Sequence, residues 1–204
     1  MSKIIYCIRH GISQHNINYL HHGSKTFYDP AFTDTSLIKE GFQQARHLKQ
    51  TWTDIDSIEL VVVSPLKRTL QTAWEIFGDR EVPIISLESA REFPMGLQTC
   101  NKRSNTTLLQ QKYPTIDFSD LQTNEDSLWL THREETIDEL NLRIQKITEF
   151  LLCRPETHIA FVNHSSFIGQ MKDNHIRLLD NGDEELKHCY PYKIQLTTQE
   201  NSNL

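Results

Sequence analysis

The alternation of short, β-branched apolar runs with longer stretches of helical periodicity is the feature that most limits how this chain can fold. The runs at 3–8, 60–63 and 158–163 are typical of strands buried on both faces of a sheet. The stretches between them place apolar residues three or four positions apart, as in amphipathic helices. This order predicts an α/β fold, in which a central, mostly parallel sheet is flanked by helices as a three-layer sandwich.

The same pattern predicts the individual elements. We expect strands at 3–8, 60–63, 82–85 and 158–163, and helices at 35–52, 65–77, 134–152 and 165–171. Pro65 suits a first helical turn, because the N–H group that proline lacks would be unpaired there. Residues from about 94 to 130 show little periodicity, so we expect an insertion over the carboxyl ends of the strands, where specificity is often determined.

Size and charge exclude several classes of protein. The 204 residues, 37% of them hydrophobic, suit a single domain over 1–204. The net charge of -6 disfavours nucleic-acid and anionic-membrane partners. No apolar run approaches the roughly 20 residues that span a bilayer, and the first residues do not resemble a signal sequence, so we expect a cytoplasmic protein. The oligomeric state is not indicated.

The cysteine and histidine spacings do not predict a metal site. Four cysteines occur without a CxxC pair and are expected to be free thiols: Cys7, Cys100, Cys153 and Cys189. The histidines at positions 10, 15, 21 and 22 lack a metal-binding spacing and are expected at the surface or in a phosphate site. The acidic segment 180–185 lacks the ligand pattern of a calcium loop and is expected to be a solvated turn.

Candidate catalytic residues follow the predicted strands, beginning with Arg9, His10 and Gly11. Loops at the carboxyl ends of strands are where open α/β sheets bind ligands. An imidazole can attack phosphorus, and a neighbouring guanidinium offers donors matched to phosphate oxygens. Because glycine has no side chain, Gly11 would let the backbone approach neighbouring atoms closely. Alone, however, the tripeptide fits an ordinary turn equally well.

Three further fragments lie in comparable places. Arg68 follows the strand 60–63 on the first turn of a helix, whose N-terminus favours an anion. His164 follows the strand 158–163, and Glu92 precedes the irregular segment. Taken singly, these residues could be a solvated arginine, a capping histidine and a surface acid.

Together the fragments resemble the histidine phosphatase superfamily, also called the phosphoglycerate mutase-like family, over about 4–171. The order arginine-histidine-glycine, arginine, glutamate, histidine is that of the family, and Asn16 matches the end of its opening motif. The second motif is matched by Ser64, Leu66, Arg68, Thr72 and Ala73. Segments at 100–104, 113–119, 125–129 and 133–134 resemble a plant and fungal branch of the family.

The resemblance implies a phosphatase that acts on a small phosphorylated substrate without metal or cofactor. His10 would be the nucleophile, and Arg9, Arg68 and a protonated His164 would clamp the phosphoryl oxygens. Glu92 would act first as general acid and then as general base. Asn16 would add a hydrogen bond to the phosphate.

Some positions leave alternatives open. Ile12, Asn163 and the pair Ser165-Ser166 depart from the family pattern, and Asp29 or Glu134 could replace Glu92 as the acid. Three cations in the insertion could bind a second anionic group or be solvated: Lys102, Arg103 and Lys112. Three aromatic residues could line a pocket or anchor the insertion: Tyr113, Phe118 and Trp129. A phosphoryl-transferring mutase and a non-catalytic phospholigand-binding module are the alternative functions.

Overall fold

A computed structural model describes residues 2–175, 177–178 and 186–197 of the chain. Its strands are β1 Ser2–Arg9, β2 Leu60–Val63, β3 Ile84–Ser86, β4 Ile116–Asp117, β5 His158–Asn163, β6 Arg177–Leu178 and β7 Pro191–Thr197. Its α-helices are α1 Gln14–His22, α2 Lys25–Tyr28, α3 Lys39–Thr51, α4 Lys67–Phe77, α5 Thr106–Lys112, α6 Ile137–Cys153 and α7 Ser165–His175. The predicted acidic turn at 180–185 lies outside the described residues.

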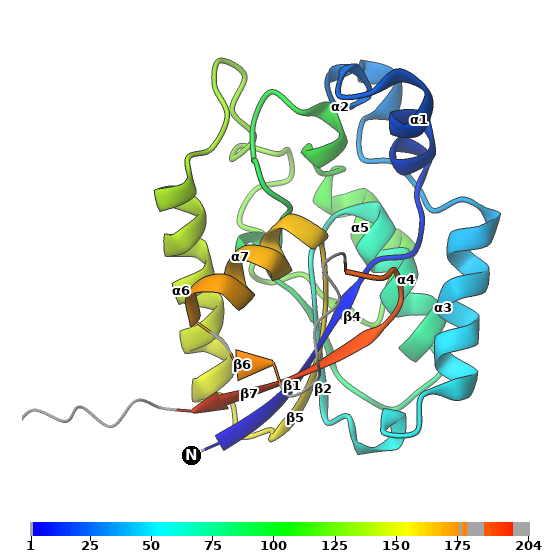
Figure 1. The fold of residues 1–204 in the computed structure, drawn as a ribbon, viewed down its shortest axis with the longest axis vertical. Coiled ribbons are helices and arrows are strands. Elements are labelled where there is room, and N and C mark those ends of the chain that lie inside the picture. Colours follow the sequence, from blue (N-terminus) through cyan, green and yellow to red (C-terminus); the bar gives the residue numbers. More distant parts are fainter. Residues whose placement is uncertain (1, 176, 179–185, 198–204) are drawn as a thin grey trace, which may run out of the picture.

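One sheet organises the described part of the chain, with strand order β4-β3-β2-β5-β1-β7-β6. Strands β1 to β5 pair in parallel, whereas β7 runs antiparallel to β1 and β6 antiparallel to β7. The predicted mostly parallel sheet is therefore confirmed. Because β2, β5 and β1 are adjacent and parallel, the residues that follow them lie at one edge of the sheet (Figure 1).

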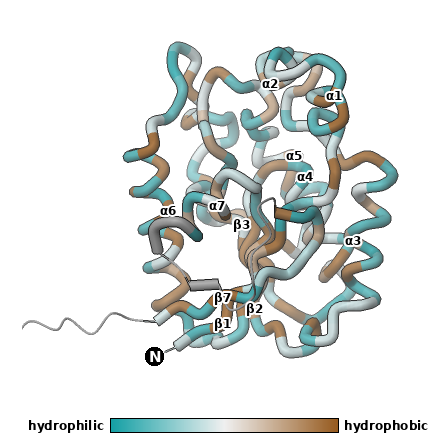
Figure 2. Tube along the Cα trace, in the orientation of Figure 1, coloured by the Kyte–Doolittle hydropathy of each residue, from teal (hydrophilic) through white to brown (hydrophobic). Residues whose placement is uncertain are grey.

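Helices cover both faces of this sheet, as expected because β1 carries buried apolar side chains on both of its faces. Tyr6 and Ile8 face a core shared with α3, α4 and α5, whereas Ile5 and Cys7 face a core shared with α6 and α7. Figure 1 shows α3 and α4 on one side of the sheet and α6 and α7 on the other. The hydropathy colouring of Figure 2 places hydrophobic stretches in the central strands between these layers. The predicted three-layer sandwich is thus confirmed.

Three predicted helices begin later than expected. Helix α3 begins at Lys39 rather than at 35, because Leu37 and Ile38 donate their N–H groups to the Gln71 side chain and to the Ile12 carbonyl. Residues 35–38 are thereby held against the loop that follows β1. Helix α4 begins at Lys67 rather than at Pro65, where the Asp34 carboxylate accepts the Lys67 N–H at 2.8 Å.

Helix α6 begins at Ile137 rather than near 134, because a capping box defines its N-terminus. The Glu139 N–H donates to Thr136 Oγ1 at 3.3 Å, and the Thr136 N–H donates to Glu139 Oε2 at 2.9 Å. Each side chain satisfies a backbone donor that the helix leaves unpaired.

The expected insertion at 94–130 is only partly an insertion over the strand ends. Leu109, Tyr113, Ile116 and Phe118 are buried in the core beside α3 and α4, and β4 pairs with β3 at the sheet edge. The expectation is therefore wrong for residues 106–121, which widen the sheet. These contacts favour anchoring over pocket lining for Tyr113 and Phe118.

Two further features bear on the expectations from sequence. The four cysteines are free, and only Cys153 is exposed. Within the described part of the chain, no helix combines the length and the apolar character needed to cross a membrane.

The strand β7 was not expected, although Tyr192, Ile194 and Leu196 alternate inward along it.

Candidate active site

The loop after β1 packs so tightly against α3 that both sides need glycine. A Cβ atom at Gly11 would lie 2.5 Å from the Gly41 carbonyl oxygen, and one at Gly41 would lie 2.1 Å from the Ile12 carbonyl oxygen. The Gly11 N–H also donates to Thr72 Oγ1 at 3.0 Å, which ties the loop to α4. The expected close approach at Gly11 is therefore an approach to the protein's own backbone. It fixes the position of the neighbouring His10.

His10 is buried, and its hydrogen bonds define its tautomer. Its Nδ1 lies 2.7 Å from the Gly11 carbonyl oxygen, which can only accept, so Nδ1 carries the proton. Nε2 then bears a lone pair, toward which the Nε–H of Arg68 points at 3.2 Å. Burial, reinforced by the charge of Arg68 and by His164, holds the pKa of His10 well below its ordinary value. The ring is therefore neutral near pH 7, as a nucleophile must be.

Arg68 is fully buried at the first turn of α4 and is oriented by three acceptors. Besides His10, it donates Nη1–H to the Cys100 carbonyl at 2.7 Å and Nη2–H to Asn101 Oδ1 at 3.0 Å. Its guanidinium is thus fixed between the β1 loop and the segment 99–101. Because a guanidinium has five N–H donors, two donors remain beyond these three bonds.

His164 follows β5 and lies beside His10, with ring centroids 5.2 Å apart. Its Nε2 lies 2.8 Å from Ser64 Oγ, whereas its buried Nδ1 has no hydrogen-bond partner among the described residues. Burial, followed by the charge of Arg68, holds the pKa of His164 well below its ordinary value. Burial beside Arg68 disfavours a positive charge on this ring, and the expectation of a protonated His164 against a bound phosphoryl group stays a prediction.

Glu92 presents a buried carboxyl group to the same region. Its Oε1 accepts the N–H groups of Phe93 at 2.9 Å and Phe167 at 3.3 Å. Burial raises the pKa of Glu92 above its ordinary value, although Arg68 and the two N–H groups oppose the shift. A raised pKa keeps a carboxyl group protonated to a higher pH than an ordinary glutamate, which suits a group that gives its proton to a leaving group.

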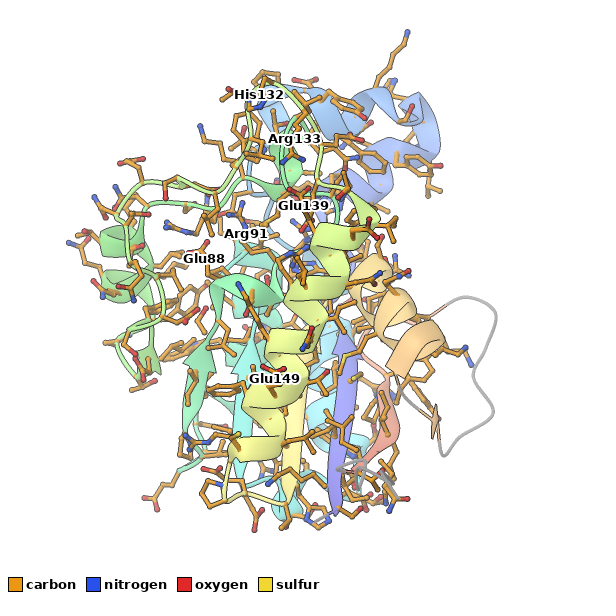
Figure 3. The ribbon with its side chains drawn as sticks, turned by 90° about the vertical axis from the view of Figure 1, so that its left-hand side faces the viewer. Glu88, Arg91, His132, Arg133, Glu139 and Glu149 are labelled. Carbon is orange, nitrogen blue, oxygen red and sulfur yellow. The ribbon has the colours of Figure 1, made fainter. Side chains whose placement is uncertain are left out.

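The backbone that precedes Glu92 is held by two buried arginines. Arg143 of α6 donates Nη1–H to the carbonyls of Ser89 and Arg91, at 2.8 and 2.7 Å, and pairs with Glu135 through its other nitrogens. Arg91 pairs with Asp126, and Figure 3 shows Arg91 beside Glu88 on the segment that follows β3. Glu92 is therefore placed by a network of charged groups rather than by a helix or strand.

Asn16 and Arg9 complete the predicted set. Asn16 lies in the first turn of α1, where Oδ1 accepts from the N–H and the hydroxyl of Ser13 at 3.0 and 2.7 Å. Arg9 ends β1 and donates Nη1–H to the Leu186 carbonyl at 2.7 Å. Both side chains line the same cavity as His10 and Glu92.

The cavity has a volume of about 540 Å³ and lies at the carboxyl ends of the strands. Arg9, His10, Asn16 and Glu92 line it, whereas Arg68 and His164 contact His10 without lining it. The structure therefore brings all six predicted residues together. Ser165 and Ser166, at the N-terminus of α7, also line the cavity and are expected to present backbone N–H groups to an anion.

Two residues of the site were not predicted. His188 lines the cavity, with its ring centroid 5.6 Å from that of His10 and its Nδ1 2.5 Å from the His10 carbonyl oxygen. Asp34 is buried and accepts the N–H groups of Lys67 and Ser104, each at 2.8 Å, which ties the start of α4 to the segment after Arg103. A strand bridge between Arg9 and His188 brings the distant C-terminal segment to the site.

The structure also resolves several alternatives. Of the three insertion cations, Arg103 is buried against Glu88, and Lys102 lies over Trp129. Lys112 lies over Tyr113, and none of the three lines the cavity. The Asp29 carboxylate accepts the N–H of Ala31, and the Glu134 carboxylate accepts hydrogen bonds from the Tyr28 hydroxyl and the Gln98 amide. Neither acid lines the cavity.

The histidine cluster separates in the structure. His10 and His15 are buried, whereas His21 and His22 are exposed at the end of α1. Across the described residues, no group of three or more histidine, cysteine, aspartate or glutamate side chains is arranged to hold a metal ion.

Together, the fold and the site define an α/β protein with a buried histidine after its first strand, in contact with a buried arginine. Residues 5–182 match the family model described as "Histidine phosphatase superfamily (branch 1)". The chain belongs to the histidine phosphatase superfamily.

Individual relatives are similar to most of the chain. A phosphoglycerate mutase-like protein 1 of Arabidopsis thaliana is 32% identical over 81% of this chain and 69% of its own length. A "Probable phosphatase" of Schizosaccharomyces pombe is 27% identical over 80% of this chain and 74% of its own. The structure of an alpha-ribazole phosphatase from Shigella flexneri has a TM-score of 0.55 and 23% identity, covering 81% of this chain and 75% of that one.

Proposed function

We propose that the protein is a metal-independent phosphatase that hydrolyses a phosphomonoester through a phosphohistidine on His10. The observation that carries the proposal is the state of His10: a neutral ring with Nδ1 bonded to a carbonyl and the lone pair of Nε2 available beside Arg68. An oriented, neutral imidazole next to a fixed guanidinium suits nucleophilic attack on a phosphoryl group.

In the first step, the lone pair of His10 Nε2 forms a bond to phosphorus as the bond from phosphorus to the ester oxygen breaks. The leaving oxygen takes the proton of Glu92, whose raised pKa keeps that proton available. In the second step, water gives a proton to the Glu92 carboxylate and attacks phosphorus. The phosphorus–nitrogen bond breaks, and the lone pair returns to His10.

Charge on the transferring group would be offset by side chains alone. Arg9 and the remaining donors of Arg68 would bind the phosphoryl oxygens, with Asn16 adding a neutral donor. The unpaired Nδ1 of His164 gives it a free hydrogen-bonding atom that a phosphoryl oxygen would satisfy. The phosphate dianion would also raise the pKa of His164, so that the ring could become protonated on binding.

The substrate is proposed to be a small phosphorylated molecule, because the cavity of about 540 Å³ falls within the size range of small-molecule sites. The four free cysteines support a cytoplasmic location, where thiols stay reduced.

Phosphate release in water enriched with ¹⁸O, with EDTA present, tests the proposal. We expect one ¹⁸O atom in each released phosphate and a rate unchanged by the chelator. An isomerised ester with little free phosphate would indicate a mutase, and loss of turnover that one divalent ion restores would contradict metal independence. Binding of phosphate esters without turnover would indicate a phospholigand-binding module.

A further inference from the structure

The cavity that contains His10 is lined by both polar and apolar side chains. Arg9, His10, Glu92 and the two serines of α7 provide polar atoms around the candidate phosphate site. The rest of the lining contains seven apolar or aromatic side chains, Ile12, Ile17, Tyr19, Leu20, Phe27, Phe93 and Pro94, beside His15, Asn16, Gln98, Cys100, Asn101 and His188. A phosphate occupies only a small part of about 540 Å³, so most of the cavity is available to the rest of the substrate.

Helix α1 carries the transition from polar to apolar wall. Asn16, Ile17 and Leu20 all line the cavity, and Leu20 follows Asn16 by four residues and Ile17 by three, which places it on the same side of the helix as both. Since a helix rises about 1.5 Å per residue, Leu20 lies roughly 6 Å further along the axis than Asn16. Along this face of α1, the lining thus changes from the polar Asn16 to the apolar Ile17 and Leu20. Leu20 is 75% exposed, so packing in the core does not account for an apolar residue at this position.

Two aromatic side chains continue this wall. Phe27 stacks on Tyr19, with centroids 5.1 Å apart and planes 7° apart, and meets the His15 ring edge-on at 6.2 Å. Phe93 follows Glu92 directly and also lines the cavity. A leaving group whose oxygen lies near the Glu92 carboxyl group would therefore have Phe93 and Pro94 beside its next atoms.

The described lining offers no second arginine or lysine for another anionic group. Arg9 is the sole arginine or lysine among the described residues that line the cavity, and it directly precedes the candidate nucleophile His10. Arg103, which is close in sequence to the lining residues Cys100 and Asn101, donates to both oxygens of Glu88 at 2.9 and 3.0 Å. A carboxylate or second phosphate on the leaving group would lose water there without gaining a charged partner.

From these observations we infer that the substrate is a phosphomonoester with an uncharged, largely apolar leaving group, such as an alkyl or aryl alcohol. The inference rests on the proposed function and specifies its substrate class. A substrate of this class differs from phosphoglycerates, which carry a carboxylate beside the phosphate ester.

Ethyl, butyl and hexyl phosphate provide the test, because their leaving oxygens have similar basicity and differ in apolar length. We expect kcat/KM to rise by up to about fourfold per methylene group buried. 3-Phosphoglycerate and glycerol phosphate should be poorer substrates than butyl phosphate. Ile17→Ala and Phe27→Ala should each lower the ratio of hexyl to ethyl phosphate by roughly tenfold, as expected for the loss of part of an apolar wall.

Leu108→Ser serves as the matched control, because Leu108 is 59% exposed on α5 and does not line the cavity. It should keep the chain-length dependence of the unmodified protein. Hydrolysis that is independent of chain length, or faster with 3-phosphoglycerate, would overturn the substrate class and leave the phosphatase proposal standing. If the protein hydrolyses none of these esters, nor p-nitrophenyl phosphate, both the substrate class and the phosphatase proposal are overturned.

Discussion

The Nε–H group of Arg68 lies 3.2 Å from Nε2 of His10, the atom that we propose attacks phosphorus. The contact orients the imidazole, and the charge of Arg68 adds to burial in holding the pKa of His10 well below its ordinary value. During attack, the lone pair of Nε2 must leave this hydrogen bond for phosphorus. We therefore expect the Nε–H of Arg68 to move to a phosphoryl oxygen as the substrate binds.

Arg68→Lys tests this dual role, because lysine keeps the charge but loses the planar arrangement of donors. A lysine cannot reach His10, the Cys100 carbonyl and Asn101 Oδ1 together. We expect kcat/KM to fall by roughly 10² to 10³, as for the loss of one oriented donor in other active sites. Arg46→Lys is the control, since Arg46 is exposed and pairs with Glu75. Equal activity of the two variants would show that Arg68 contributes charge alone.

Glu92→Gln tests the general acid, because the benefit of a proton grows with the basicity of the leaving oxygen. The variant should lose roughly 10² to 10⁴ in rate on an alkyl phosphate and much less on p-nitrophenyl phosphate. It should also lose the limb of the pH–rate profile that begins above the ordinary glutamate pKa, since burial raises the pKa of Glu92.

Steady-state rates on both esters, with Glu134→Gln as control, measure this difference. Glu134 lies outside the cavity and bonds to Tyr28 and Gln98, so its variant should not distinguish the esters. An equal loss on both esters in Glu92→Gln would assign Glu92 a positioning role.

Asp126→Asn tests the buried network that holds the Glu92 segment. Arg91 and Asp126 form two bonds of 2.7 and 2.5 Å, and their side chains are 0% and 1% exposed. Because the change removes the closer of the two carboxylates that pair with this buried guanidinium, and Glu88 remains at 3.2 Å, we expect unfolding free energy to fall by up to about 3–5 kcal/mol.

Urea unfolding of Asp126→Asn beside Glu139→Gln provides the comparison. Glu139 pairs with Arg133 on the surface, toward the N-terminal end of α6 (Figure 3), and its loss should have a far smaller effect. Similar midpoints for the two variants would contradict the role given to the buried pair.

Stability should decline as the pH falls through the range in which unfolded histidines bind protons. Burial lowers the pKa of His10, His15 and His164 in the folded protein. Below about pH 6.5 the unfolded chain therefore binds more protons than the folded one, so the stabilisation present above that pH is progressively lost.

Unfolding free energies at pH 7.5 and 5.0 measure this loss, and His15→Gln should reduce the difference between them. His132→Gln, at an exposed position, is the control and should leave the difference unchanged. A protein equally stable at both pH values would contradict the neutral state assigned to the buried histidines.

Local patterns predicted the parts of the fold that depend on local sequence. The strands at 60–63 and 158–163 were predicted with the correct bounds, because every residue in these runs is apolar or lies at the strand end. β7 was missed because the polar residues Lys193, Gln195 and Thr197 interrupt its apolar run, although the residues between them face the core. Its place beside β1 depends on long-range pairing that no local pattern contains.

The candidate site shows the same division. Arg9, His10 and His164 could be placed together because parallel strands bring their carboxyl ends to one edge. His188 could not, because its position depends on the antiparallel return of β7 along β1. The pKa of His164 could not be anticipated from the sequence, because burial, which sequence does not show, lowers it.

Rapid-quench labelling tests the central proposal most directly. The protein is mixed with a ³²P-labelled alkyl phosphate, stopped without acid within one turnover, digested and mapped by mass spectrometry. We expect label on Nε2 of His10, since Nδ1 is bonded to the Gly11 carbonyl, and neither label nor turnover in His10→Ala. Turnover with label on a serine, or with full activity in His10→Ala, would contradict the account.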